Sequence, residues 1–215
     1  MVVYLCPGYH SSALTDRFIQ AVWPDLTTHN KDAESLKNPE ISGIPEIIVF
    51  PSDRRPPYSP HAIVDHLCES LDKSLAGRAE AGAIAAPRVV WIGFSAGVVG
   101  GILAARQWHR AGHSVDKFIA IDGWGVPLGQ RFPIYRMAHD AWTHHSQSWM
   151  GQGLRQMPGN SWGDRPHRSF IADPPVPHLD LWRSPDQVQG YLLPKTNPTN
   201  SCTAADCIRS WTNPG

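Results

Sequence analysis

Short apolar runs recur along the chain, and each is apolar rather than alternating between apolar and polar residues. Continuous apolar runs are typical of strands that are covered on both faces in a parallel sheet. Segments with helical periodicity lie between the early runs, at residues 12–23, 61–75 and 98–110. This order predicts a doubly wound, mostly parallel α/β sheet of about five to six strands flanked by helices. The apolar runs are residues 2–5, 47–50, 89–92, 118–121 and 169–172.

The chain has 215 residues, which suits one domain with an insert. We expect that domain to span residues 1–193. Residues 125–166 interrupt the alternation of predicted strands and helices and are rich in Trp, Met, His, Gly and Gln. Their length and composition predict an inserted cap. Residues 194–215 are polar and turn-rich, which predicts a loosely held C-terminal tail.

Composition excludes several classes of function. The formal net charge is zero and the pI is about 7.2, so no long-range field attracts nucleic acid or an anionic membrane. The N-terminus does not resemble a signal peptide, and the longest apolar stretch, residues 96–105, is too short to span a bilayer. We therefore expect a cytoplasmic protein with free thiols at Cys6 and Cys68. A bridge between Cys202 and Cys207 is left open.

The most informative motif is Gly-Phe-Ser-Ala-Gly at residues 93–97, a G-x-S-x-G pattern between an apolar strand and a small-residue helix. A sharp strand-to-helix turn would project the Ser95 hydroxyl above the sheet edge. Gly93 and Gly97 leave room for that turn, and the free N–H groups of the helix would face developing negative charge. A nucleotide-binding turn is the alternative, but neither phosphate-binding glycine motif is present.

These residues resemble the α/β-hydrolase superfamily, and the resemblance covers most of residues 2–193. It implies a reduced α/β-hydrolase fold and a serine hydrolase that needs neither a metal nor an organic cofactor. Family members carry a His-Gly-like turn after an early strand, where this chain has Pro7 and Gly8. By resemblance, the backbone N–H groups of Tyr9 and Ala96 would form the oxyanion hole.

The resemblance also indicates the general base. Members of the superfamily commonly end with a strand, the catalytic His, a Pro and a final amphipathic helix. His178, Pro185 and a helix at residues 188–193 match that order. Among the other histidines, His109 and His113 lack a third ligand that would make a metal site. The remaining rivals for the base are His10, His61, His66, His139, His144, His145 and His167.

The acid has two main candidates. The usual acid follows a strand between residue 118 and the last strand, and no such strand is evident in residues 125–166. Asp122 closes an apolar run beside the Ser95 strand and is favoured. Asp173 is the alternative acid, although only five residues separate it from His178 and prolines stiffen that loop. Asp140 ranks third.

The chain order Ser, Asp, His agrees with that of the superfamily. The resemblance then implies an acyl-enzyme on Ser95, with a small-molecule acyl ester or thioester as the substrate. Trp124, Trp142 and Trp149 are candidate substrate-binding residues, although tryptophans of this segment could equally form its core. Two alternatives remain: an acyltransferase that uses the same acyl-enzyme, and a catalytically silent scaffold that binds a ligand or partner.

Overall fold

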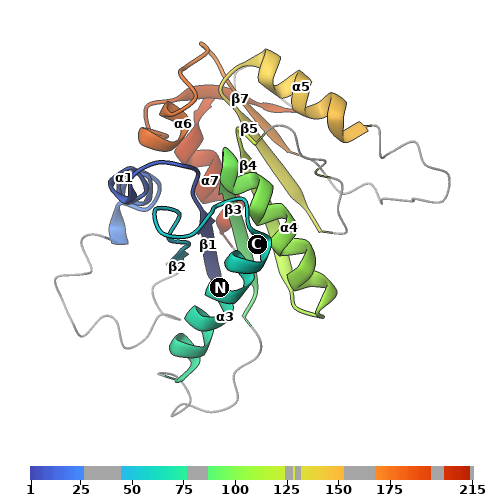
Figure 1. Cartoon of the computed structure of the whole chain (residues 1–215). Helices are drawn as coiled ribbons and strands as arrows, with labels where there is room; N and C mark the ends of the chain where they lie inside the picture. The colour runs from blue at the N-terminus through green and yellow to red at the C-terminus, as the bar shows by residue number, and fades with distance from the viewer. Residues whose placement is uncertain are drawn as a thin grey trace.

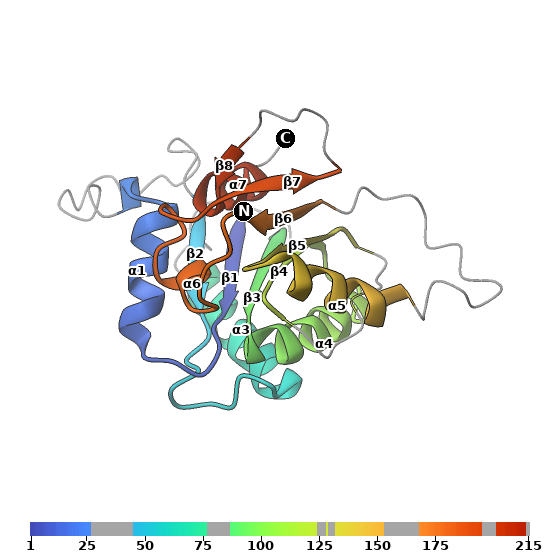
Figure 2. The ribbon, with the colours of Figure 1, turned by 90° about the horizontal axis from the view of Figure 1, so that it is seen from above.

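The computed structural model describes residues 1–26, 45–76, 87–123, 128, 132–152, 168–194 and 201–213. Within these residues, eight strands form one sheet in the order β2-β1-β3-β4-β5-β6-β7-β8, which can be followed in Figure 2. The strands are β1 (Val2–Cys6), β2 (Glu46–Val49), β3 (Val89–Phe94), β4 (Val115–Ile121), β5 (Ile134–Ala138), β6 (Ser169–Ala172), β7 (Gln189–Leu193) and β8 (Ser201–Thr203).

The first six strands are parallel, and β7 and β8 add antiparallel pairings at one edge. The chain runs outward from β1 to β2 and then crosses back to β3 on the other side of β1. The strand order therefore reverses between β1 and β3. In open α/β sheets, ligands bind beyond the carboxyl ends of the strands at such a reversal.

Helices cover both faces of the sheet (Figure 1). Alternate residues of β1 point to opposite faces: Val3 and Leu5 join one apolar cluster, and Val2 and Tyr4 join the other. The first cluster includes residues of α1 (Ser12–Val22), α6 (Asp180–Arg183) and α7 (Ala204–Thr212), and the second includes residues of α3 (Pro60–Ala76) and α4 (Ala96–Arg110). A further helix, α5 (Ala141–Gln152), contacts β5 and β6. None of the helices described here could cross a lipid bilayer, because none combines the necessary length with apolar character.

The α/β class and the mostly parallel sheet confirm the sequence prediction, but the sheet has eight strands rather than five to six. One of the additional strands, β5, lies inside residues 125–166, so that segment is not wholly a cap. The sequence Ile-Tyr-Arg-Met-Ala of β5 carries Arg136 at its centre, which breaks the apolar run that marks the other parallel strands. Arg136 and Tyr135 are only half-buried, which explains why this strand tolerates polar groups.

The end of the chain also departs from the prediction. Residues 188–193 were expected to form a helix, but β7 occupies most of this segment and pairs antiparallel with β6. A Cβ at Gly190 would lie 2.2 Å from the Ile171 carbonyl oxygen, so this glycine serves a close strand approach. The predicted loose tail at residues 194–215 is wrong for residues 201–213, because Ile208 and Trp211 of α7 are buried in the core.

Local chemistry explains why α7 forms. Thr203 is its N-cap and accepts a hydrogen bond from the Asp206 N–H at 3.1 Å, while Asp206 accepts one from the Thr203 N–H. This reciprocal pair is a capping box. Arg209 then donates to the Val22 carbonyl at the end of α1, at 2.9 Å. Cys202 and Cys207 in this region are free thiols, with Sγ atoms 2.8 Å apart.

We predict that Trp211→Ala lowers the free energy of unfolding by about 3–5 kcal/mol, because it removes a large side chain from the core. Urea unfolding followed by circular dichroism measures the change. Trp142→Ala is the matched control, since Trp142 is 78% exposed and its removal should change stability by less than about 0.5 kcal/mol. Equal, small effects of the two substitutions would mean that α7 is not part of the folded core.

Candidate active site

Ser95 lies in the turn between β3 and α4, in a backbone conformation that L-residues rarely adopt. Its φ is 52° and its ψ is −121°. The turn is held because the Ser95 N–H donates to the Ile121 carbonyl at 3.0 Å. Gly97 is required at this point, since a Cβ there would lie 1.9 Å from the Cys6 carbonyl oxygen at the end of β1. The side chain of Ser95 is thus carried at the carboxyl edge of the sheet.

The turn after β1 lies directly against Ser95. A Cβ at Gly8 would be 3.1 Å from the Ser95 Cβ, so the absence of a side chain at position 8 lets the two segments approach. Tyr9 follows in this turn with 66% of its surface exposed. Ala96 is the first residue of α4, where a backbone N–H has no partner within the helix. Tyr9 and Ala96 therefore come from the two segments that flank Ser95.

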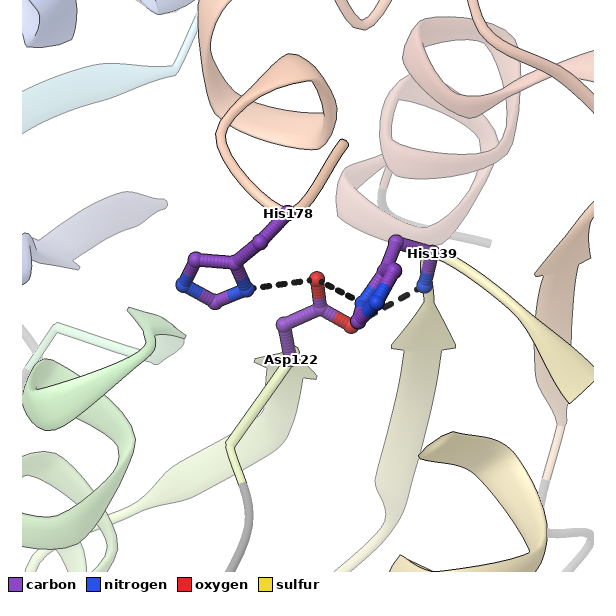
Figure 3. Close-up of side chains that lie close together, drawn as sticks. All are labelled: Asp122, His139 and His178. Atoms are coloured by element: carbon purple, nitrogen blue, oxygen red, sulfur yellow. Dashed lines mark hydrogen bonds and ion pairs between the residues drawn. The ribbon is translucent and has the colours of Figure 1, made fainter. Parts of the chain in front are cut away.

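Asp122 follows β4, the strand next to that of Ser95, and its carboxylate is fully buried. Three N–H groups donate to it (Figure 3). The Oδ2 atom accepts from His178 Nδ1 at 2.9 Å and from His139 Nδ1 at 2.8 Å, while Oδ1 accepts from the His139 backbone N–H at 3.0 Å. The backbone φ of Asp122 is 49°, in the left-handed region. Asp tolerates that region better than most residues, and the turn aims its side chain at both imidazoles.

His178 lies in the loop after β6, and its ring is held from two directions. Its Nδ1 binds Asp122, and its ring stacks on Phe94 with centroids 4.8 Å apart. Phe94 in turn stacks on Trp182 at 5.1 Å, and Trp182 stacks on Phe18 at 3.8 Å. Because Phe94 immediately precedes Ser95, this stacking ties the His178 ring to the strand that ends at the Ser95 turn. Figure 3 shows His178 Nε2 on the side of the ring away from Asp122.

The structure therefore brings Asp122 and His178 together, at the same sheet edge as Ser95. Among the described residues, no hydrogen bond joins the Ser95 hydroxyl to His178. Asp173, the alternative acid, is exposed, and its backbone N–H pairs with the Gln189 carbonyl at 3.0 Å. It makes no hydrogen bond to His178 within the part of the chain that the structure describes. The carboxylate that contacts His178 is that of Asp122.

His139 is a residue of this site that the sequence analysis did not single out. It follows β5, and its carbonyl accepts the Val176 N–H at 3.1 Å, which ties the His178 loop to the end of β5. The sequence feature that indicates His139 is its position directly after the strand Ile-Tyr-Arg-Met-Ala. The apolar pattern alone does not identify that strand, so the position of His139 at its end could not be predicted. His139 Nε2 lies 3.4 Å from Asp140 Oδ2.

Asp140 is the N-cap of α5 and accepts a hydrogen bond from the Thr143 N–H at 2.6 Å. Partial burial acts to raise the pKa of Asp140, but hydrogen bonds from Thr143, the neighbouring His139 and the Trp142 N–H together hold that pKa below its usual value. Asp140 is therefore an anion at neutral pH. A pocket of about 290 Å³ opens beside this group and is lined by His139, Asp140, Trp142, Thr143 and Ser146.

The other predicted site residues fall in different places. Trp142 is exposed at the rim of this pocket. Trp124 lies outside the described residues, and so does the side chain of Trp149. His10, one of the rival histidines, packs its ring 5.8 Å from that of Phe94, and burial lowers its pKa.

One group of side chains has the composition of a metal site. Asp122, His139 and His178 each offer one ligand atom, and these atoms lie within 4.8 Å of one another. The sequence analysis expected no metal and did not place His139 in this group. Two imidazoles and one carboxylate are a ligand set that zinc and other transition metals accept.

Comparison with known proteins does not assign the chain. It matches no protein-family model, and a search of curated proteins finds no relative. Neither comparison therefore indicates what chemistry the site performs.

We predict that Gly97→Ala destabilises the protein by at least about 1–3 kcal/mol, because the added methyl collides with backbone that has no room to move. Chemical denaturation measures the loss. Gly101→Ala on the same helix is the matched control, since its Cβ would lie 3.2 Å from the Cys6 side chain. There, a gain in helix propensity of up to about 1 kcal/mol offsets mild crowding. Similar stabilities of the two variants would contradict the close approach of α4 to β1.

Proposed function

We propose that this protein is a serine hydrolase with a reduced α/β-hydrolase fold, which cleaves a carboxylic ester or thioester through an acyl-enzyme on Ser95. The observation that carries the proposal is the buried Asp122 carboxylate bound to His178 Nδ1 at 2.9 Å, one strand away from a strained Ser95 turn. A buried carboxylate on the far side of an imidazole is the arrangement that prepares a histidine to act as a base.

In the proposed mechanism, His178 Nε2 removes the Ser95 proton as the hydroxyl attacks the acyl carbon. Asp122 keeps the single proton of neutral His178 on Nδ1, which leaves the Nε2 lone pair free, and it stabilises the imidazolium that forms. The step requires Nε2 and the Ser95 Oγ to approach within about 2.6–3.2 Å. His178 then returns the proton to the leaving alcohol or thiol, and water releases the acyl group in a second, similar step.

We assign the stabilisation of the substrate oxyanion, which forms when the Ser95 hydroxyl attacks, to the backbone N–H groups of Tyr9 and Ala96. The close approach of Gly8 to Ser95 supports this assignment, since it brings the turn that carries Tyr9 against the nucleophile. The N-terminus of α4 adds a positive partial charge at the same point, where negative charge develops on the substrate oxygen.

Exposed aromatic side chains at the carboxyl edge suggest where the substrate binds. Tyr9 and Tyr58 are 66% and 55% exposed, and their rings lie 6.2 Å apart. Tyr58 belongs to the loop before α3, which also approaches α4, because a Cβ at Gly100 would lie 2.1 Å from the Pro57 carbonyl oxygen. We assign the Tyr9–Tyr58 pair and Trp142 to the rim of a site for a small-molecule acyl ester.

We predict that a fluorophosphonate probe modifies the purified protein at one site, Ser95, because its hydroxyl is activated by His178. Mass spectrometry of the intact protein and of its peptides measures the stoichiometry and locates the adduct. Ser95→Ala is the control and should remain unlabelled. A folded wild-type protein that is not labelled would favour the silent-scaffold alternative, whereas an adduct on another serine would refute Ser95 as nucleophile.

We predict that Asp122→Asn lowers kcat for p-nitrophenyl esters by orders of magnitude, about 10⁴ by analogy with serine proteases, because His178 loses the tautomer that leaves Nε2 free. Asp173→Asn is the matched control and should retain most of the activity, since Asp173 is exposed and does not touch His178. The experiment compares kcat across esters of increasing chain length, after thermal melting shows that both variants fold. Comparable losses in the two variants would overturn the assignment of Asp122.

A further inference from the structure

We propose that Asp122, His139 and His178 bind a divalent transition metal, Zn²⁺, and that its binding switches off the serine chemistry proposed above. The catalytic part of this inference rests on the proposed function, but the binding part does not. The three side chains place two imidazole Nδ1 atoms on one carboxylate oxygen, at 2.8 and 2.9 Å. The proposed serine hydrolase mechanism needs only the imidazole of His178 beside Asp122, so the presence of the second imidazole, that of His139, requires another explanation.

The positions of the ligand atoms suit a small ion. Tetrahedral zinc with bonds of about 2.1 Å spaces its ligand atoms about 3.4 Å apart. The two N–O distances here are about half an ångström shorter than that spacing, and all three atoms lie within 4.8 Å of one another. The ion would replace the two Nδ1 protons that now lie between the imidazoles and Oδ2. Three protein ligands leave a fourth position for water.

Groups outside the three ligands are arranged as around known metal sites. A metal-bound histidine usually donates its other ring N–H to a carboxylate or carbonyl, which fixes its tautomer. His139 Nε2 has such a partner in the Asp140 carboxylate, 3.4 Å away. The His139 backbone N–H holds Asp122 Oδ1, which leaves Oδ2 to face the imidazoles. A pocket adjoins one of the three ligands, His139, and the side chains of His139 and His178 are 24% and 36% exposed, so solvent reaches both imidazoles.

Metal binding and catalysis then exclude each other through the tautomer of His178. As a general base, His178 carries its proton on Nδ1 and keeps the Nε2 lone pair for the Ser95 hydroxyl. A metal on Nδ1 moves that proton to Nε2, so the same neutral ring has no lone pair left to accept another proton. Zn²⁺ should therefore lower kcat, and it should slow fluorophosphonate labelling of Ser95 in the same proportion.

The binding test is isothermal calorimetry of Zn²⁺ into the metal-free protein, without substrate. We expect one site, lost in His139→Asn, because the Asn amide nitrogen can donate to Asp122 but cannot bind a metal. Asp140→Asn should keep the site and weaken it about 10–100-fold, as loss of an outer partner does elsewhere. Cys68→Ser is the control for adventitious binding, because Cys68 is an exposed thiol near Asp65 and Asp72 on α3. Cys68→Ser should bind as the wild type does.

The catalytic test measures ester hydrolysis with micromolar Zn²⁺ and after EDTA, each variant against its own metal-free rate. Inhibition that EDTA reverses, and that His139→Asn abolishes, would support the proposal. Absence of Zn²⁺ binding in an active wild-type enzyme, or binding that disappears in Cys68→Ser but not in His139→Asn, would overturn it and leave the hydrolase intact. One-site binding that requires His139, in a protein without Ser95 reactivity, would support the metal site and refute the hydrolase.

Discussion

The whole site depends on the burial of one carboxylate. Asp122 has no exposed surface, and a buried ionised group is costly unless it is hydrogen-bonded on all sides. Here three N–H donors, from His139 and His178, meet it at distances of 2.8–3.0 Å. Those donors come from the end of β5 and the loop after β6, so satisfying Asp122 requires that three neighbouring segments converge. The hydrogen-bonding requirement of this buried carboxylate thus links the three segments at the sheet edge, and removing any donor would leave a buried oxygen with one hydrogen bond fewer.

Backbone strain is concentrated at the same place. Ser95 and Asp122 are the non-glycine residues with positive φ in the described part of the chain, and they follow adjacent strands. Such conformations cost about 1–3 kcal/mol each and persist only where the surroundings determine them. The two turns are closely packed: a Cβ at Gly97 would collide with the Cys6 carbonyl oxygen, and a Cβ at Gly123 would collide with the Val98 side chain. Strain of this kind in a serine and an aspartate, rather than in glycines, favours a functional interpretation of the pair.

The sequence predicted those parts of the site that have local signals. Ser95 lies in a glycine motif between two recognisable elements, and Asp122 ends a continuous apolar run. His139 was predicted only as one of several rivals for the base, because its strand, β5, carries Arg136 at its centre and lacks a continuous apolar pattern. The C-terminal elements were missed for a different reason. The strand β7 forms because it pairs with β6, and no local sequence preference indicates that pairing. For α7, by contrast, the capping box formed by Thr203 and Asp206 is a local signal in the sequence.

Two imidazoles share the Oδ2 atom of Asp122. Oδ1 accepts a hydrogen bond from the His139 N–H and Oδ2 accepts one from each ring, so both carboxylate oxygens are restrained. His178 therefore has one preferred orientation, which the stack on Phe94 reinforces from the ring face. In the proposed mechanism, such preorganisation would lower the barrier of the proton transfer, because the ring need not be ordered during the reaction. The same cluster of two imidazoles and a carboxylate is arranged to accept a cation, so the contacts that would prepare His178 as a base in the proposed mechanism would also make the site sensitive to metals.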